Sequence, residues 1–125
     1  MRIIGGKYKG RIIKPVSGLN ARPTTDFAKE SLFNILNNRV DFESLKVLDL
    51  FSGTGSIAFE FASRGAENVH LVEKDHKHIA GIKSTIGKIG FDNIIGSEDY
   101  VRYANAEKAK GNNWMSYKEW LIKNV

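Results

Sequence analysis

The chain has 125 residues and a mass of 14.0 kDa, which is enough for one hydrophobic core and too little for two. Its 42% apolar and 26% charged residues, with two prolines, exclude the disordered, collagen-like and repeat classes. Cysteine is absent, which excludes disulfide frameworks, thiolate metal sites and thiol nucleophiles and predicts a cytoplasmic protein. No stretch approaches the roughly 18 apolar residues of a membrane span, and the start lacks the apolar core of a signal peptide. We therefore expect neither export nor a membrane partner.

The net charge of +5 is concentrated near the start of the chain. Six of the 19 basic residues, and no acidic residue, precede Asp26, which leaves 13 basic and 14 acidic residues in the rest. Residues 1–25 combine these cations with glycines, short apolar pairs and one tyrosine, a composition typical of a hairpin or arm. Such an arm neutralises phosphates and stacks on a base, so RNA binding is predicted. The alternative is a solvated face that only keeps the protein soluble. The predicted RNA-binding residues are Arg2, Lys7, Tyr8, Lys9, Arg11 and Lys14.

Beyond residue 25 the pattern alternates between helices and strands. A turn and cap-forming residues precede a first helix over 26–38, whose apolar face is predicted at Ala28, Leu32, Ile35 and Leu36. The further predicted elements are a strand over 46–51, a helix over 56–64, a strand over 68–73, a helix over 76–89 and a strand opening at 93–95. This order predicts an α/β fold with a parallel sheet.

The last residues fit this alternation least well. Residues 100–110 are compatible with a helix, 111–113 with a turn, and 116–122 with a short capped helix. We therefore divide the chain into a basic arm over 1–25 and a domain over 26–125, with 100–125 as an atypical tail.

The most informative spacing surrounds the turn after the first predicted strand. Asp49 lies in that strand, Gly53 and Gly55 follow in the turn, and Glu73 ends the next strand, 20 residues after Gly53. Glycines let a ligand approach the main chain, helix amides favour an anionic group, and a carboxylate at the second strand end suits ribose hydroxyls. The glycines alone also fit a nicotinamide-binding turn. Asp49 favours S-adenosylmethionine, because a buried acid repels a pyrophosphate and attracts an ammonium and a sulfonium.

A plainer interpretation of these acids is that Asp49 caps the turn and that Glu73 is solvated. The three histidines, His70, His76 and His78, do not have the spacing of a metal site. We expect surface positions for them and no metal.

Three segments of the chain resemble RsmD-type methyltransferases, which methylate the exocyclic N2 of a guanine in small-subunit ribosomal RNA. The segments are 1–11, 22–34 and 47–55, and the resemblance extends to about residue 95. It implies a Rossmann-like fold with an incomplete parallel sheet, S-adenosylmethionine as cofactor, and ribosomal RNA or the assembling small ribosomal subunit as partner. It also implies that Glu73 holds the ribose, that Asp99 approaches the adenine amine, and that the other cofactor residues surround the methionine part. The cofactor residues implied are Arg22, Thr24, Asp49, Ser52, Gly53, Thr54, Gly55, Glu73 and Asp99.

The chain departs from this family at the catalytic loop. Enzymes of this type carry an Asp- or Asn-Pro-Pro-Phe/Tyr loop after the fourth strand, and both prolines here, Pro15 and Pro23, precede the glycine turn. No catalytic residue is assigned, and we expect methyl transfer to be weak or absent because nothing aligns the amine with the sulfonium methyl. Truncation, a shifted reading frame and a shortened paralogue all fit this pattern. The alternative function is a non-catalytic RNA-binding or ribosome-assembly module.

The missing fourth strand has a structural consequence. In a doubly wound sheet it pairs beside the first strand, so residues 47–51 would form an exposed apolar edge. Such an edge promotes self-association unless the C-terminal segment covers it.

Overall fold

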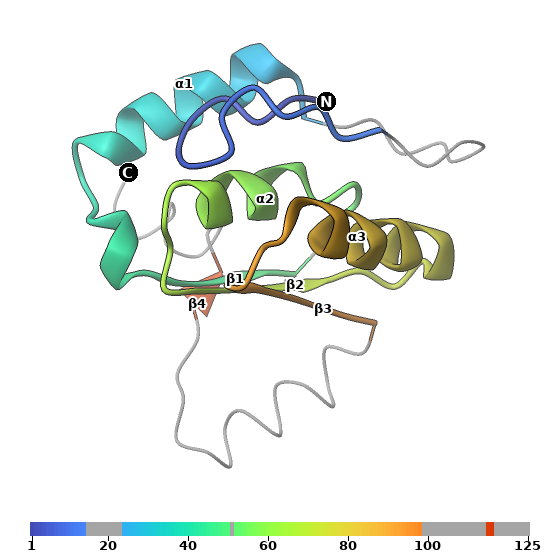
Figure 1. The fold of residues 1–125 in the computed structure, drawn as a ribbon. Helices are drawn as coiled ribbons and strands as arrows, with labels where there is room; N and C mark the ends of the chain where they lie inside the picture. The colour runs from blue at the N-terminus through green and yellow to red at the C-terminus, as the bar shows by residue number, and fades with distance from the viewer. Residues whose placement is uncertain (15–23, 51, 99–114, 117–125) are drawn as a thin grey trace.

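The computed structural model describes residues 1–14, 24–50, 52–98 and 115–116, and these form an α/β structure (Figure 1). The order of the predicted elements is confirmed through the third strand, with boundaries shifted by two residues at most. None of the described helices is long and apolar enough to cross a membrane. The elements are α1 (Asp26–Asn37), a 3-10 helix (Phe42–Ser44), β1 (Lys46–Asp49), α2 (Ser56–Ser63), β2 (Asn68–Val72), α3 (His76–Ile89), β3 (Ile94–Ser97) and β4 (Met115–Ser116).

The strands form one parallel sheet in the order β3-β2-β1-β4. Leu48 of β1 is in register with His70 of β2, which is in register with Ile95 of β3. The helices α2 and α3 connect these strands, as expected of successive βαβ units. Because parallel strands end at the same edge, the segments that follow β1, β2 and β3 meet there. This strand order is the 3-2-1-4 order of a doubly wound sheet.

The edge of β1 is paired with the C-terminal segment. Val47 is in register with Met115 and Leu48 with Ser116, both in parallel. Ser116 was predicted as the N-cap of a short helix, and an N-cap residue has extended backbone, so its place in β4 does not decide that prediction. The other elements predicted for residues 100–122 lie outside the described residues. Self-association through this edge stays a prediction.

The described helices lie on one side of the sheet and form two layers. Figure 1 shows α2 and α3 against the sheet, with α1 and the N-terminal segment farther out, over α2. The core fills the space between the sheet and the helices. Its central members are Val47, Phe59, Val69, Leu71, Ile79, Ile82 and Ile94.

The N-terminal segment, residues 1–14, folds back on itself as expected of a hairpin. An antiparallel bridge joins Arg2 to Ile12, and the Ile3 amide donates to the Arg11 carbonyl at 3.0 Å. The side chains of Ile3 and Ile13 are buried in the same core as the helices. The segment is thus anchored along the part that the structure describes, while the division of the chain at residue 25 stays a prediction.

The apolar face predicted for α1 is wrong in part. Ala28 and Ile35 are exposed, whereas Lys29, Phe33 and Leu36 are buried. These three positions are three and four residues apart and share one side of the helix. The buried face of α1 differs from the predicted one because Lys29 occupies an inward position. Hydrophobic periodicity assigns such a position to an apolar residue.

We predict that Gly6→Ala destabilises the protein more than Gly10→Ala. Both glycines have a left-handed φ, +81° and +86°, so alanine costs each about 1–2 kcal/mol. A Cβ at Gly6 would lie 2.0 Å from the Ser63 carbonyl oxygen, whereas one at Gly10 meets nothing within 4 Å. In urea unfolding, Gly6→Ala should lose at least about 2 kcal/mol more than Gly10→Ala. Equal losses would contradict the close contact between the segment and α2.

Candidate cofactor-binding site

The turn between β1 and α2 requires both of its glycines. Gly53 has φ +57° and Gly55 φ +83°. A Cβ at Gly55 would lie 2.9 Å from Phe59 and 3.3 Å from Ile82, so this residue lets the turn pack on the helices. A Cβ at Gly53 would meet no atom of the described residues within 4 Å, so on that side the main chain is open to an approaching ligand.

Glu73 reaches this turn from the end of β2. One carboxylate oxygen accepts a hydrogen bond from the Gly53 amide at 2.6 Å, and the other accepts from the Asp75 amide at 3.0 Å. The structure thus brings together two residues that are 20 positions apart in the sequence. Each carboxylate oxygen accepts more than one hydrogen bond, so Glu73 retains acceptors for the hydroxyls of a ligand.

Asp49 is the last residue of β1, and Ser52 precedes the first glycine of the turn. The Asp49 side chain is only 1% exposed and is on the helix-facing side of the strand, like Val47 two residues earlier. The Ser52 amide donates to the Val72 carbonyl at 3.1 Å, while the buried Ser52 hydroxyl has no hydrogen-bond partner among the described residues. Since buried polar groups are normally paired, this hydroxyl is a candidate for a hydrogen bond to a group that the described residues do not supply.

The residues at this edge of the sheet fit S-adenosylmethionine. Gly55 is the N-cap of α2 and provides no side-chain cap, so the first amides of the helix favour an anionic group. Asp49 and Glu73 supply carboxylates for an ammonium, a sulfonium or hydroxyls, and Gly53 leaves the main chain accessible. A pyrophosphate fits less well, because a buried carboxylate precedes the turn.

Three of the other predicted cofactor residues are not shown at this turn. Thr24 is exposed and precedes Thr25, the N-cap of α1. Arg22 and Asp99 lie outside the described residues. Thr54 is in the turn itself, where its hydroxyl lies 3.5 Å from the Met1 sulfur.

The predicted RNA-binding cations are exposed along the N-terminal segment, and the tyrosine among them is partly buried. Tyr8 packs edge-on against Phe91 with ring centroids 4.6 Å apart, and its hydroxyl donates to the Gly90 carbonyl at 3.4 Å. Lys7 lies over the Tyr8 ring, 5.3 Å from the centroid. Part of the ring is therefore used inside the protein, and its stacking on a base stays a prediction. The exposed members are Arg2, Lys7, Lys9, Arg11 and Lys14.

Sequence reasoning missed a buried ion network in the helical layers. Glu60 of α2 is 0% exposed and accepts hydrogen bonds from the amides of Ile4 and Gly5, both at 2.9 Å. The Arg64 guanidinium donates to the same carboxylate at 2.8 Å. The signal in the sequence was a single acid in the middle of the otherwise uncharged and largely apolar run 56–63.

Lys29 completes this network from α1. Its ammonium lies 3.5 Å from the Glu60 carboxylate and donates to the Ser56 hydroxyl at 3.2 Å and to the Arg2 carbonyl. Burial lowers the pKa of Lys29, and the carboxylate of Glu60 opposes that shift. The signal was a lysine in helical register with Phe33 and Leu36.

The predicted surface position holds for one of the three histidines. His76 is exposed and its Nδ1 lies 2.8 Å from a Glu98 carboxylate oxygen, whereas His70 and His78 are buried. The prediction is wrong for those two, because the side chains of His70 in β2 and His78 in α3 are both less than a tenth exposed. Within the described ranges, no three histidine, cysteine or acidic side chains gather as metal ligands would.

Asp75 stabilises the start of α3, next to the turn, in a way that depends on pH. Its carboxylate caps α3 by accepting from the His78 amide at 3.1 Å and the Lys77 amide at 2.9 Å, and these bonds lower its pKa below the usual 3.8. The unfolded chain therefore binds more protons just below pH 3.8, so the stabilisation is present above this pH and is lost as pH falls through the lowered pKa.

We predict that Asp75→Ala lowers the melting temperature at neutral pH and that its deficit shrinks as the pH falls below 3.8. Thermal unfolding between about pH 2.5 and 7 measures this. Asp92→Ala is the matched control, because Asp92 is an exposed acid near the other end of α3. A deficit that is independent of pH would contradict a role for the ionised carboxylate.

Comparison with known proteins shows which family the chain resembles. The family described as "Conserved hypothetical protein 95" matches residues 1–115. Ribosomal RNA small subunit methyltransferase D of Escherichia coli (strain K12) is 39% identical over 102 residues, covering 76% of this chain and 50% of the relative. An uncharacterized methylase of Rickettsia prowazekii (strain Madrid E) is 42% identical over 81 residues, covering 60% and 34%.

The fold has a counterpart among solved structures. A hypothetical protein from Thermus thermophilus superposes with a TM-score of 0.75 and 29% identity, covering 90% of this chain and 64% of that one. Together with the strand order, this similarity confirms the predicted Rossmann-like fold with an incomplete parallel sheet. The chain spans a third to a half of the length of the two curated relatives named above. Because the family match covers nearly the whole chain, this protein belongs to that family, as an RsmD-type N-terminal segment.

Proposed function

We propose that this chain is the cofactor-binding and RNA-binding part of a methyltransferase that uses S-adenosylmethionine and acts on N2 of a guanine in small-subunit ribosomal RNA. The observation that carries the proposal is the 2.6 Å hydrogen bond between the Gly53 amide and Glu73, which joins the glycine turn to the carboxylate after β2. The relatives named methyltransferase D support the substrate class. Ribosomal RNA or the assembling small subunit is the proposed partner, and the cytoplasm the proposed location.

The proposed roles of the residues follow from their chemistry. S-adenosylmethionine, when bound, would supply a methyl group on a cationic sulfur. The amine would attack the methyl carbon directly, and the sulfur would leave as a neutral thioether. The buried Asp49 carboxylate stabilises the positive charge of the amino-acid part, where its effect is large because water is excluded. The hydroxyl of Ser52 and the first amides of α2 bind the ligand carboxylate. Glu73 accepts from the ribose hydroxyls while it holds the Gly53 amide.

A second candidate function is a non-catalytic RNA-binding or ribosome-assembly module. The observation that favours it is the absence of any proline after Pro23, which excludes the Pro-Pro loop that aligns the guanine amine in RsmD-type enzymes. Alignment is a large part of catalysis in a reaction without a covalent intermediate. A chain with the cofactor turn and without this loop therefore binds and does not turn over efficiently.

We predict that the chain binds S-adenosylmethionine and its demethylated product with micromolar affinity, and NADH not measurably. Gly53→Ala should weaken binding at least about tenfold, because its Cβ occupies the open space through which the ligand approaches the main chain. Gly10→Ala is the matched control, since it also has a left-handed φ and open surroundings but lies in the N-terminal segment. Isothermal titration calorimetry measures all of these affinities.

Either of two results would contradict the cofactor assignment. One is NADH binding in preference to S-adenosylmethionine, which would favour a nicotinamide site. The other is the same affinity in Gly53→Ala and Gly10→Ala, which would place the ligand away from the turn.

We also predict that methyl transfer by this chain alone is weak or absent. The measurement is incorporation of the labelled methyl group into small-subunit ribosomal RNA and into assembled small subunits, at high protein concentration. Incorporation that is lost in Gly53→Ala would establish an enzyme despite the missing loop. RNA binding and cofactor binding without incorporation would establish the second function.

A further inference from the structure

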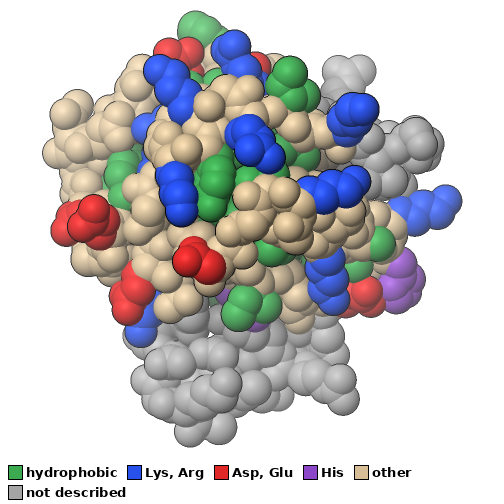
Figure 2. Space-filling model, in the orientation of Figure 1, with side chains coloured by type: hydrophobic (Ala, Val, Ile, Leu, Met, Phe, Trp, Pro, Cys, Tyr) green, Lys and Arg blue, Asp and Glu red, His purple; other side chains and the backbone are tan. Residues whose placement is uncertain are grey.

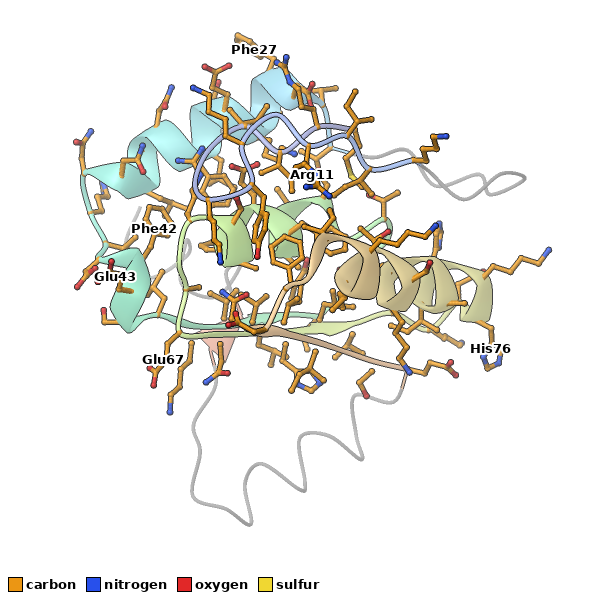
Figure 3. All side chains as sticks on the ribbon, viewed as in Figure 1. Arg11, Phe27, Phe42, Glu43, Glu67 and His76 are labelled. Atoms are coloured by element: carbon orange, nitrogen blue, oxygen red, sulfur yellow. The ribbon has the colours of Figure 1, made fainter. Side chains whose placement is uncertain are left out.

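A groove of about 400 Å³ lies between residues 11–14 of the N-terminal segment and α3. Arg11 and Lys14 line it from the segment, and Lys88 and Ser84 line it from the helix. Figure 3 shows Arg11 in the region between the segment and α3. The volume is within the range of roughly 300–1,000 Å³ that small-molecule sites occupy, and is large enough for a nucleotide-sized segment.

The three cations of this groove are not neutralised by the protein. Arg11, Lys14 and Lys88 are exposed, and none of them takes part in an ion pair within the described ranges. Figure 2 shows Lys and Arg side chains spread over this face, where the N-terminal segment adjoins α3. Two of the cations come from one element and the third from another, so folding alone brings them together. Unpaired cations around a concave surface favour an anionic ligand.

Apolar side chains accompany these charges. Ile12 is 74% exposed in the wall of the groove, and Ile89 lines it from the end of α3. A site for an isolated inorganic anion needs only donors, whereas a nucleic-acid strand presents sugars and bases between its phosphates. The mixture of cations, the Ser84 hydroxyl and exposed isoleucine therefore favours a strand.

A second, smaller cavity lies between the groove and the glycine turn. Its volume is about 20 Å³, and it is lined by Thr54 of that turn and by Met1. It shares four lining residues with the groove, namely Ile13, Lys14, Gly81 and Thr85, so the two cavities are adjacent. A strand lying in the groove is thus directed toward the turn at which the cofactor is proposed to bind.

We propose that this groove binds the phosphodiester backbone of single-stranded RNA through Arg11, Lys14 and Lys88, and that it leads the strand toward the glycine turn. The proposal rests on the proposed function and deepens it. It assigns RNA binding to one side of the N-terminal segment and to α3, and excludes the segment's Lys7 and Lys9, which do not line the groove.

Two double variants test the assignment with equal loss of charge. Lys14→Gln with Lys88→Gln removes two groove cations, whereas Lys46→Gln with Lys83→Gln removes two exposed cations that neither line the groove nor belong to the predicted RNA-binding residues. The measurement is fluorescence polarisation of a labelled single-stranded RNA at several salt concentrations. The groove variant should bind at least about fivefold more weakly, with a salt slope smaller by about 0.7 for each phosphate that is no longer neutralised. The control variant should bind like the unaltered chain.

A neutral substitution and two competitors separate the groove from general electrostatics. Ser84→Leu fills part of the groove without a change of charge and should also weaken RNA binding. Unlabelled RNA should displace the probe, whereas inorganic phosphate and guanosine monophosphate should do so only at far higher concentrations. Unchanged melting temperatures establish that each variant is folded.

Equal weakening by the two double variants would overturn the proposal, since it would indicate diffuse attraction to the basic surface. Displacement by inorganic phosphate as effectively as by RNA would also overturn it, because the groove would then be an anion site only. Calorimetric titration with S-adenosylmethionine distinguishes a failure of the groove proposal from a failure of the proposed function. If the chain binds the cofactor but its RNA affinity is unchanged by the groove substitutions, only this inference is refuted. If the groove substitutions weaken RNA binding but the chain does not bind the cofactor, only the proposed function is refuted.

Discussion

The arrangement of the helical layers depends on the buried carboxylate of Glu60. A charge without exposure to water is tolerated only when it is paired and hydrogen-bonded. Here Lys29 supplies an ammonium from α1, Arg64 a guanidinium from the end of α2, and the amides of Ile4 and Gly5 two donors from the N-terminal segment. One side chain thus connects three parts of the protein that are distant in sequence. Each of them loses a required partner if it moves, so their relative positions are fixed.

This constraint determines what surrounds the glycine turn. With the N-terminal segment held on α2, Met1 lies against Thr54 of the turn and residues 11–14 lie beside α3. Arg11 and Lys14 therefore line a groove next to the proposed cofactor site, and only one side of the segment faces this groove. Composition left a hairpin and a flexible arm open. A flexible arm would sample many positions, whereas the anchored hairpin presents its cations in one arrangement. Anchoring lowers the entropy lost on binding and makes the charges specific to a ligand of matching shape.

The sheet and the turn were predictable from sequence because their signals are local. The apolar runs at β1 and β2, the glycines at 53 and 55, and the carboxylate at 73 each identify an element or its end without reference to the rest of the chain. The buried face of α1 was not, because Lys29 is polar and its burial depends on Glu60, 31 positions later. β4 is two residues long and is defined by its pairing with β1, so no pattern in its own sequence predicts it. The groove was not predictable from sequence either, because it forms only where α3 lies beside residues 11–14.

The described geometry separates binding from alignment. The turn, Asp49 and Glu73 are proposed to bind the cofactor, and the groove is proposed to bind the strand. Neither proposed role aligns a guanine amine with a methyl group. Well-oriented reactants gain effective concentrations of about 10⁵–10⁸ M, so alignment contributes about 7–11 kcal/mol to lowering a barrier. Affinity for both ligands does not replace that contribution, because binding that is equal in the ground state and the transition state leaves the rate of the chemical step unchanged. A chain with this turn and groove but no Pro-Pro loop is therefore expected to keep its ligands and to lose most of its rate.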